Sequence, residues 1–515
     1  MLNALTHGWL GFLTAYGVAA LGLYLGFRRR KQIGSTRKIF IYALPVMLGA
    51  GLIWSIIGEA THSIWRTVGD NVTMLFGAAV ILGAGWITPQ ILSLRRLGDI
   101  HKRGTLLIDG SVDEQQRPGG HETLTLASQQ IPLMDETKHF KIMGTTGTGK
   151  STAIRELLTH ALIRGDRAVI ADPDGSYLEK YYDPARGDVI LNPFDDRAAR
   201  WDLFAEILQL HDADQLARSL IPDYEGSDRN WRHYARTFVT SVLRQLHRAQ
   251  QQDLAKLYWL LLLAPVEELR DLLEATPAGA FLGTENGRFF DSVRSVTAVH
   301  VSALEHVARQ TTGSPLSVRS WIREGKGVLF LPYKASEIAA LRQIISSWMR
   351  LAVYQTMDAK EGDQKLWFVV DELDALGAID GLKDALARLR KFGGRCVLGF
   401  QSIAQVRGTY GDAEAQTIVE NCGNSLILRC SASERGGTAE FASRLIGRRE
   451  IIRKHTSHSR PTRLGGSLHE VRTASDQHTT EDAVMASEIE QLPDFTGFLK
   501  VASRPEWMRV GLAKR

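Results

Sequence analysis

Cysteine is scarce in this sequence, which contains only three cysteines among 515 residues. Cys396, Cys422 and Cys430 all fall late in the chain, and no two of them have the short spacing of a metal-binding pair. This scarcity excludes a disulfide framework and predicts reduced thiols in a cytosolic domain. His455 and His458 lie in a polar stretch without a second ligand pair, which disfavours a metal site there.

The sequence also lacks a strong excess of either charge, since its formal net charge is +5. Such a balance permits a polyanionic partner, for example a nucleic acid, but does not require one. The length is sufficient for two or three domains with substantial cores.

Uncharged apolar runs long enough to cross a bilayer are confined to the first hundred residues, at positions 8–27, 39–57 and 72–92. The connection at residues 28–38 and the segment after the third run are both basic. Three crossings with an outside N-terminus keep both basic segments in the cytoplasm, whereas two crossings would export one of them or the rest of the chain. A signal peptide is disfavoured because no basic region precedes the first run. We therefore expect residues 1–96 to form a transmembrane anchor.

The most specific motif of the chain is a glycine-rich segment at residues 144–151. It has the pattern Gly-x-x-x-x-Gly-Lys-Ser, follows an apolar run and precedes a helical pattern, so a purely structural turn is disfavoured. Glycines let backbone N–H groups turn towards phosphate oxygens, and the helix N-terminus adds partial positive charge. Lys150 is expected to reach the β- and γ-phosphates, and the Ser151 hydroxyl to take one Mg²⁺ position. The motif predicts a nucleotide site formed by Gly144, Thr145, Thr146, Gly147, Thr148, Gly149, Lys150, Ser151 and Thr152.

Polar residues follow directly after two further apolar runs. Residues 366–370 lead into Asp371 and Glu372, as a buried strand ending at the carboxyl edge of a parallel sheet would. Beside a P-loop this is typical of a Walker B element, in which Asp371 holds Mg²⁺ through water and Glu372 orients and deprotonates the attacking water. The alternative is an acidic pair that caps the next helix. Gln401 follows the run 395–400 and is expected to sense the γ-phosphate or position water, the alternative being a solvent-facing turn residue.

Strand and helix patterns alternate on both sides of a long helical region, which predicts an α/β fold with a parallel-rich central sheet. We expect a nucleotide-binding domain in two parts, residues 97–200 and 314–515, with an all-α insertion at residues 201–313. Within the insertion, residues 230–248 interleave aromatic with basic side chains. One interpretation of this composition is contact with nucleic acid. The favoured interpretation is an amphipathic helix whose aromatic side chains point inward and whose arginines are solvated.

Several segments occur in a fixed order along the chain, namely HFKIMGTTGTGKS, AVIADPDG, ILNPFD, WDLF, the helical region, SVRSW, LWFVVDEL, RLRKFGGRCVLGFQS and EIEQLPD. This ordered set resembles the conjugative type IV coupling proteins of the TrwB and TraD type. The resemblance covers nearly all of the expected cytoplasmic part. It implies a RecA-like P-loop domain related to FtsK motors.

The resemblance also assigns roles to individual residues. Lys150 and Ser151 match the family's P-loop, Asp371 and Glu372 match its Walker B pair, and Gln401 matches its third motif. Arg390 matches the family's arginine that reaches into a neighbouring subunit's site, and Arg395 is the rival for this role. The alternative for Arg390 is a solvated arginine at a helix end.

At the level of the whole protein, the resemblance implies a homo-hexamer around a central channel in the bacterial inner membrane. It implies ATP hydrolysis with Mg²⁺ at subunit interfaces, coupled to movement of single-stranded DNA with its attached relaxase. The relaxosome and the inner-membrane components of a type IV secretion system are the implied partners, and double-stranded DNA stays open as a further ligand.

Three other functions compete with this interpretation. A chromosomal translocase of the FtsK or HerA type is one, and the FtsK type would require a long linker and a C-terminal winged helix, which this sequence lacks. An ABC-type transporter needs an LSGGQ-like signature before Walker B, and residues 342–364 contain none. A membrane adaptor that uses ATP only for assembly stays open, and the absence of DNA-stimulated hydrolysis would identify it.

Overall fold

The structure is a computed structural model that describes residues 100–110, 123–223, 228–362, 364–433, 437–459 and 471–513. The three expected membrane spans, between residues 8 and 92, lie outside the described residues and remain a prediction. In the described part of the chain, no helix combines the length and apolar character that a bilayer crossing requires.

The described chain divides into two compact units. The smaller one contains most of a hairpin formed by β14 (Arg448–Ser459) and β15 (Val471–Asp482). Together with β1 (Ile100–Gly104), the hairpin makes a three-stranded sheet in the order β1-β14-β15. The larger unit carries all of the predicted nucleotide-site residues.

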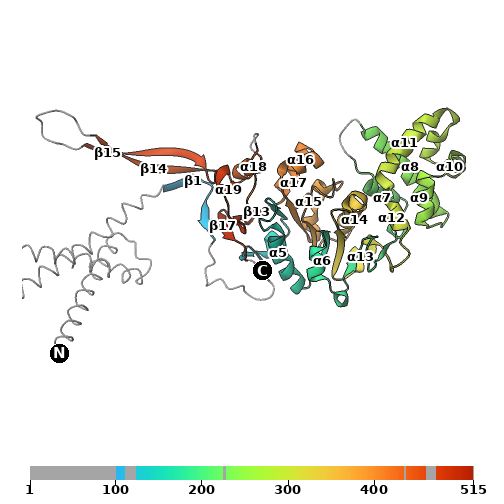
Figure 1. The fold of residues 1–515 in the computed structure, drawn as a ribbon, viewed down its shortest axis with the longest axis horizontal. Coiled ribbons are helices and arrows are strands. Elements are labelled where there is room, and N and C mark those ends of the chain that lie inside the picture. Colours follow the sequence, from blue (N-terminus) through green and yellow to red (C-terminus); the bar gives the residue numbers. More distant parts are fainter. Residues whose placement is uncertain are drawn as a thin grey trace, which may run out of the picture. The chain divides into compact units, whose positions relative to one another are not determined.

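A ten-stranded sheet forms the centre of the larger unit (Figure 1). Seven neighbouring strands, from β13 to β7, run parallel, and β16 and β17 extend the sheet in antiparallel fashion. The sequence-based prediction of an α/β fold with a parallel-rich sheet is therefore confirmed. In sheet order the strands are β2 (Leu107–Asp109), β17 (Trp507–Gly511), β16 (Thr496–Lys500), β13 (Asn424–Ile427), β5 (Phe140–Met143), β12 (Gly394–Phe400), β11 (Leu366–Val370), β6 (Arg167–Pro173), β10 (Val328–Tyr333) and β7 (Val189–Ile190).

Both faces of the central strands are buried, because alternate residues along these strands enter two separate hydrophobic cores. On β6, for example, Val169 belongs to one core and Ile170 to the other. This two-sided burial explains why the strands appear in the sequence as continuous apolar runs. The described helices of this α/β region are α4 (Leu133–Glu136), α5 (Lys150–Ile163), α6 (Ser176–Tyr181), α13 (Val318–Glu324), α14 (Ile338–Met357), α15 (Leu382–Arg388), α16 (Ile403–Tyr410), α17 (Asp412–Asn421), α18 (Gly437–Ile446) and α19 (Ala486–Glu490).

A group of helices interrupts the α/β pattern and lies beside the sheet (Figure 1). The chain leaves and re-enters the α/β region at β8 (Arg200–Trp201) and β9 (Pro315–Leu316), which pair in parallel. These bounds lie close to the predicted insertion of residues 201–313. The helices between them are α7 (Asp212–Leu220), α8 (Arg229–Arg248), α9 (Leu254–Leu262), α10 (Val266–Leu273), α11 (Gly287–Val301) and α12 (Leu304–Ala308).

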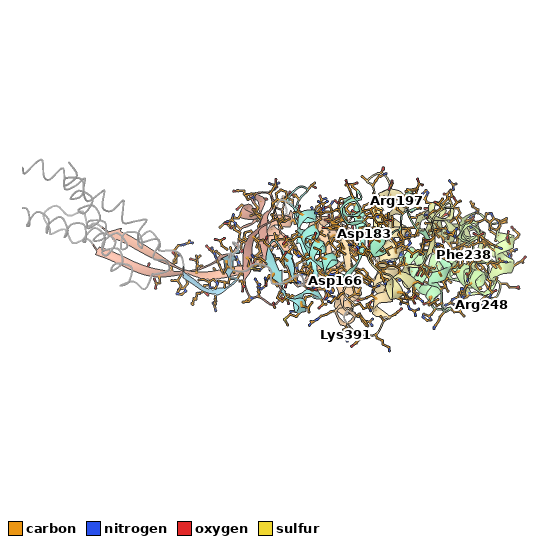
Figure 2. All side chains as sticks on the ribbon, turned by 90° about the horizontal axis from the view of Figure 1, so that it is seen from below. Asp166, Asp183, Arg197, Phe238, Arg248 and Lys391 are labelled. Atoms are coloured by element: carbon orange, nitrogen blue, oxygen red, sulfur yellow. The ribbon has the colours of Figure 1, made fainter. Side chains whose placement is uncertain are left out.

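Helix α8 contains the segment that interleaves aromatic with basic residues. Phe238 is fully buried and packs edge-on against Phe290, with 5.1 Å between ring centroids, whereas Arg248 lies at the surface (Figure 2). Trp231 packs against Phe289 at 5.5 Å. The aromatic side chains thus hold the insertion together, which favours the amphipathic-helix interpretation over nucleic-acid contact through these rings.

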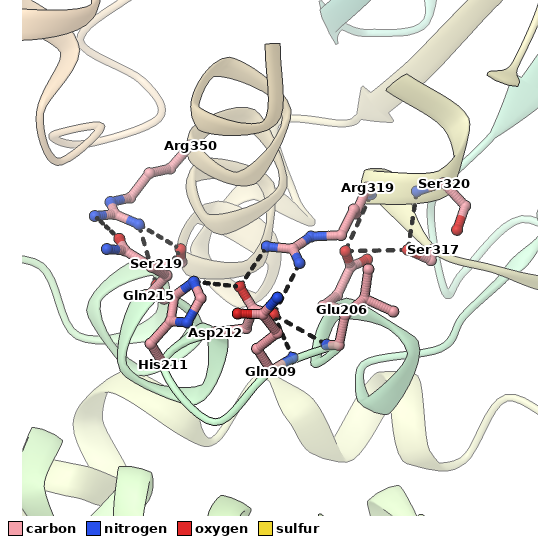
Figure 3. Close-up of polar contacts among 11 residues, drawn as sticks. Glu206, Gln209, His211, Asp212, Gln215, Ser219, Ser317, Arg319, Ser320 and Arg350 are labelled. Carbon is pink, nitrogen blue, oxygen red and sulfur yellow. Dashed lines mark hydrogen bonds and ion pairs between the residues drawn. The ribbon is translucent and has the colours of Figure 1, made fainter. Parts of the chain in front are cut away.

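Polar side chains join this insertion to the helices of the α/β region (Figure 3). Arg319 on α13 donates two hydrogen bonds to the Asp212 carboxylate at the start of α7, at 2.7 and 2.9 Å. Arg350 on α14 donates to the Gln215 carbonyl oxygen and to Ser219 Oγ, both on α7. Because charge-assisted hydrogen bonds are directional, these contacts fix the orientation of α7 against α13 and α14.

A buried histidine immediately before β5 makes stability depend on pH. His139 is 1% exposed, accepts from the Cys396 N–H at Nδ1, and its Nε2 lies 2.9 Å from the Leu386 carbonyl oxygen. Burial, together with the positive charges of Arg390 and Arg395, lowers the pKa of His139 to about 4. Since protonation favours the unfolded chain, this stabilisation is complete above the unfolded pKa of about 6.5 and is lost as the pH falls from there towards 4.

The His139→Asn variant should remove this pH dependence, because Asn cannot titrate and tolerates the positive φ of 57° at this position. Between pH 7.5 and 5.5, the free energy of unfolding of the wild type should fall by roughly 1–1.5 kcal/mol more than that of the variant. Urea unfolding followed by tryptophan fluorescence measures the difference. Identical pH profiles for the two proteins would contradict the prediction.

Candidate nucleotide-binding site

The glycine-rich segment forms the loop between β5 and α5, as its sequence pattern predicted. Gly149 caps α5 with a φ of 113°, a conformation that side chains rarely adopt, and a Cβ there would lie 2.9 Å from Leu512 Cδ1. A Cβ at Gly144 would lie 2.7 Å from Thr148 Oγ1. The loop therefore has its shape only with glycine at these two positions.

Hydrogen bonds from neighbouring segments hold this loop in place. The Thr145 N–H donates to the Arg429 carbonyl oxygen at 2.8 Å, and the Phe495 N–H donates to the Thr148 carbonyl oxygen at 2.9 Å. Thr148 Oγ1 donates back to the Thr145 carbonyl oxygen at 2.7 Å. Segments from the far C-terminal part of the chain thus preorganise the loop.

Lys150 lies buried at the start of α5, and its Nζ donates to the carbonyl oxygens of Gly144 and Thr145 at 2.9 and 3.2 Å. Burial lowers the pKa of Lys150, while the negative charges of Asp371 and Glu372 oppose that shift. The ammonium group is bonded to neutral carbonyl oxygens of the loop itself. Phosphate oxygens are stronger acceptors for it, because they carry full negative charge.

The structure brings Ser151 and Asp371 into direct contact. Ser151 Oγ donates to Asp371 Oδ2 at 2.6 Å, and the Asp371 side chain lies at the carboxyl end of β11, where the residue is 3% exposed. The other carboxylate oxygen, Oδ1, is buried and has no hydrogen-bond partner among the described residues. In the described ranges, no three His, Cys, Asp or Glu side chains cluster as a complete metal site.

The oxygen donors of Ser151 and Asp371 fit Mg²⁺ better than they fit a metal whose ligands all come from the protein. Mg²⁺ is commonly held by one or two protein oxygens, with substrate phosphates and water completing an octahedron. Ser151 Oγ and the Asp371 carboxylate are oxygen donors of this kind, and they lie in direct contact beside the glycine-rich loop. The residues therefore fit a Mg²⁺–nucleotide complex.

A second set of contacts joins three separately predicted residues. Gln401 Nε2 donates to Glu372 Oε1 at 3.1 Å, and Thr146 Oγ1 donates to Gln401 Oε1 at 3.0 Å. Burial and the neighbouring charge of Asp371 raise the pKa of Glu372, which makes this carboxylate a better proton acceptor. Gln401 thus connects the P-loop to the Walker B glutamate and is not a free turn residue.

The two arginines proposed for contact with another subunit differ in exposure. Arg395 is 1% exposed, donates to Glu136 Oε2 at 2.8 Å and to the Gly393 carbonyl oxygen, and cannot reach another chain. Arg390 is exposed in a short 3₁₀ turn (Leu389–Phe392), next to the surface residue Lys391 (Figure 2).

Arg390 precedes β12 and Gln401 follows it, so the two residues lie at opposite edges of the sheet. A seven-residue strand spans about 20 Å, which is too far for Arg390 to reach the P-loop of its own chain. The structure therefore leaves Arg390 outside the site that the other predicted residues form.

Two further residues of the site were not among the predicted ones. The Tyr177 hydroxyl donates to Asp371 Oδ2 at 2.8 Å. Asp172, at the carboxyl end of β6, accepts from the N–H groups of Tyr177 and Leu178, and burial raises the pKa of Asp172 to about 6. The segment AVIADPDG contained a signal for Asp172, since it places an acid at the end of a strand beside Walker B.

The sheet, the loop and the carboxylates define a P-loop nucleotide-binding protein. The chain belongs to the type IV secretion-system coupling proteins, because the family model described as "Type IV secretion-system coupling protein DNA-binding domain" matches residues 123–513. This finding confirms the resemblance drawn from the ordered motifs.

Two characterised relatives illustrate the similarity. The coupling protein TraD of Escherichia coli strain K12 is 32% identical over 394 residues, which are 75% of this chain and 54% of TraD. The type IV secretion system-coupling protein VirD4 of Bartonella quintana is 30% identical over 221 residues, or 40% of this chain and 33% of VirD4. The chain therefore aligns with about half of TraD and a third of VirD4.

Solved structures of another coupling protein share the fold. An unbound form of the bacterial conjugative coupling protein TrwBdeltaN70 has a TM-score of 0.72 at 29% identity, covering 81% of this chain and 94% of that one. The plasmid coupling protein TrwB in complex with ADP and Mg²⁺ has a TM-score of 0.71 at 30% identity, covering 81% and 95%.

Stability measurements can separate the roles of the two arginines. Arg395→Ala should lower the free energy of unfolding by about 3 kcal/mol, because it removes one partner from a buried ion pair with Glu136. Arg390→Ala should change it by less than about 0.5 kcal/mol, since the side chain is exposed. Denaturant unfolding of both variants measures the two effects, and the reverse order would contradict these assignments.

Proposed function

We propose that this protein is an inner-membrane coupling ATPase of a conjugative type IV secretion system. In this proposal it binds ATP with Mg²⁺ and uses hydrolysis to move single-stranded DNA with its relaxase towards the secretion channel. The observation that carries the proposal is the connected set of side chains from the P-loop through Gln401 to Glu372, beside the Ser151–Asp371 contact. Membership of the coupling protein family and the similarity to a nucleotide-bound TrwB support it.

Each residue of the site has a role in this proposal. Lys150 and the loop N–H groups bind the phosphates, and Ser151 and Asp371 hold Mg²⁺, which when bound neutralises charge on the β- and γ-phosphates. Glu372 orients the attacking water and accepts its proton, and Gln401 keeps the glutamate aligned with the loop.

Arg390 is assigned a role between subunits. Its support is the distance argument above, because an exposed arginine at the opposite edge of the sheet can act only on a neighbouring chain's nucleotide. This role requires a closed ring in which every site lies at a subunit interface, and we propose a homo-hexamer, as in the implied family assembly. The predicted anchor at residues 1–96 would hold the ring in the inner membrane, next to the relaxosome and the secretion-system components there.

DNA-stimulated turnover tests the proposal as a whole. Single-stranded DNA should raise ATP hydrolysis by the purified full-length wild type, and the stimulation should fall with added salt because phosphate contacts release counterions. Glu372→Gln should keep ATP binding but hydrolyse at least about 100-fold more slowly, while Lys150→Ala should lose binding. Glu268→Gln, which changes an exposed glutamate on α10, is the matched control.

Two results would contradict this assignment. An ATP hydrolysis rate that does not change when DNA is added would favour the adaptor function. Conjugation at the wild-type level by a strain whose only copy carries Lys150→Ala would exclude an ATP-driven role in transfer.

Mixed oligomers test the role of Arg390. Arg390→Ala alone should retain ATP binding and lose hydrolysis by about 10³-fold or more, the size of an arginine-finger effect. Mixing equal amounts of Arg390→Ala and Glu372→Gln chains should restore about a quarter of the wild-type rate, since a quarter of random interfaces then pair intact halves. Lys391→Ala, an exposed neighbour on the same turn, should hydrolyse ATP normally. No recovery on mixing would contradict a role between subunits.

A further inference from the structure

Tyr177 makes a contact that the proposed mechanism does not use. It lies in the first turn of α6, is fully buried, and donates from its hydroxyl to Asp371 Oδ2 at 2.8 Å. Ser151 Oγ donates to the same oxygen at 2.6 Å. One carboxylate oxygen therefore accepts two short hydrogen bonds, while the other accepts none among the described residues.

The position of Tyr177 is fixed from its backbone and from its ring. The Asp172 carboxylate accepts from the Tyr177 N–H at 3.0 and 3.1 Å and from the next N–H at 2.7 Å. The Arg155 guanidinium lies over the tyrosine ring, 5.5 Å from its centroid. Strand β6 pairs directly with β11. Tyr177 is held near the carboxyl end of β6, so its hydroxyl reaches Asp371 at the carboxyl end of β11.

The ordinary pKa of a phenol is about 10, so the Tyr177 hydroxyl is protonated at neutral pH and donates to the carboxylate. A fixed donor on Oδ2 prevents the carboxylate from rotating and exchanging its two oxygens.

We propose that Tyr177 is a positioning residue for the divalent cation, because its hydroxyl and Ser151 Oγ both hold Oδ2 of the Asp371 carboxylate and so fix this carboxylate beside the serine. The inference rests on the proposed function, since it concerns the Mg²⁺ that accompanies the nucleotide. Tyr177 itself contacts neither phosphate nor water in this role. Residues that orient a metal ligand in this way typically change metal affinity by about 10- to 100-fold when they are replaced.

The test is a Mg²⁺ titration of nucleotide binding rather than an activity assay. Binding of a fluorescent ADP analogue to the full-length protein is measured in excess EDTA and at increasing Mg²⁺. Tyr177→Phe should bind the analogue within about twofold of wild type in EDTA, but should need about tenfold more Mg²⁺ for half of the metal-dependent gain in affinity. The ring is retained in this variant, so the hydrophobic core keeps its packing.

Tyr181→Phe is the matched control. Tyr181 lies on the same helix, and its hydroxyl contacts Thr159 Oγ1 and the Arg155 carbonyl oxygen on α5, so the variant also loses a tyrosine hydroxyl. Its Mg²⁺ midpoint should equal that of wild type.

The possible outcomes separate the inference from the proposed function. A wild type that binds nucleotide without any response to Mg²⁺ would contradict the proposed function itself. A normal wild-type response with an unchanged midpoint in Tyr177→Phe would overturn only the inference. An equal loss of affinity with and without Mg²⁺, or an unfolding midpoint far below that of Tyr181→Phe, would assign Tyr177 a purely structural role and would also overturn it.

Discussion

The parallel register of β5, β12 and β11 is the constraint on which the rest of the site depends. Met143 pairs with Phe400, and Leu398 pairs with Val370, so the three strands end at one edge of the sheet. Whatever follows each strand must therefore meet there: the P-loop after β5, the carboxylate pair after β11 and Gln401 after β12. Two buried faces hold this register, because a slip of one residue would exchange the side chains of the two cores.

The two edges of the sheet differ in how their buried polar groups are satisfied. At the amino edge, Glu136 accepts from both Arg164 and Arg395, and Asp166 accepts from Arg164 and from the indole of Trp367. At the carboxyl edge, Asp371 Oδ1, Asp374 Oδ1 and the Tyr333 hydroxyl are buried without a hydrogen-bond partner among the described residues. Unsatisfied buried groups are costly, and native structures retain them mainly where a ligand or ordered water completes them. These groups at the carboxyl edge are therefore available to an occupant of the site.

Sequence patterns predicted the parts of this site that are encoded in short, continuous stretches of sequence. The P-loop needs glycine and lysine at fixed spacing, and the strand-end residues Asp371, Glu372 and Gln401 follow apolar runs, so each could be found within a short window. The contact between Tyr177 and Asp371 could not, because it joins residues 194 positions apart and no periodicity marks it. The same limit applies to Arg390 and Arg395, which flank one Gly-Gly pair; only the pairing of Arg395 with Glu136, 259 residues away, shows that it is buried.

In the proposed ring, β12 would link two nucleotide sites as well as contribute to one. The strand begins just after Arg390, which is assigned to the neighbour's nucleotide, and it ends at Gln401, which contacts Glu372 in its own site. All seven residues of β12 are buried, and both flanking strands are parallel, so the strand moves as part of a rigid sheet. A displacement of the backbone at Arg390 would then be transmitted along β12 towards Gln401 and Glu372 of the same chain. Because close-packed interiors transmit strain, this geometry gives neighbouring nucleotide sites of the proposed ring a direct structural connection.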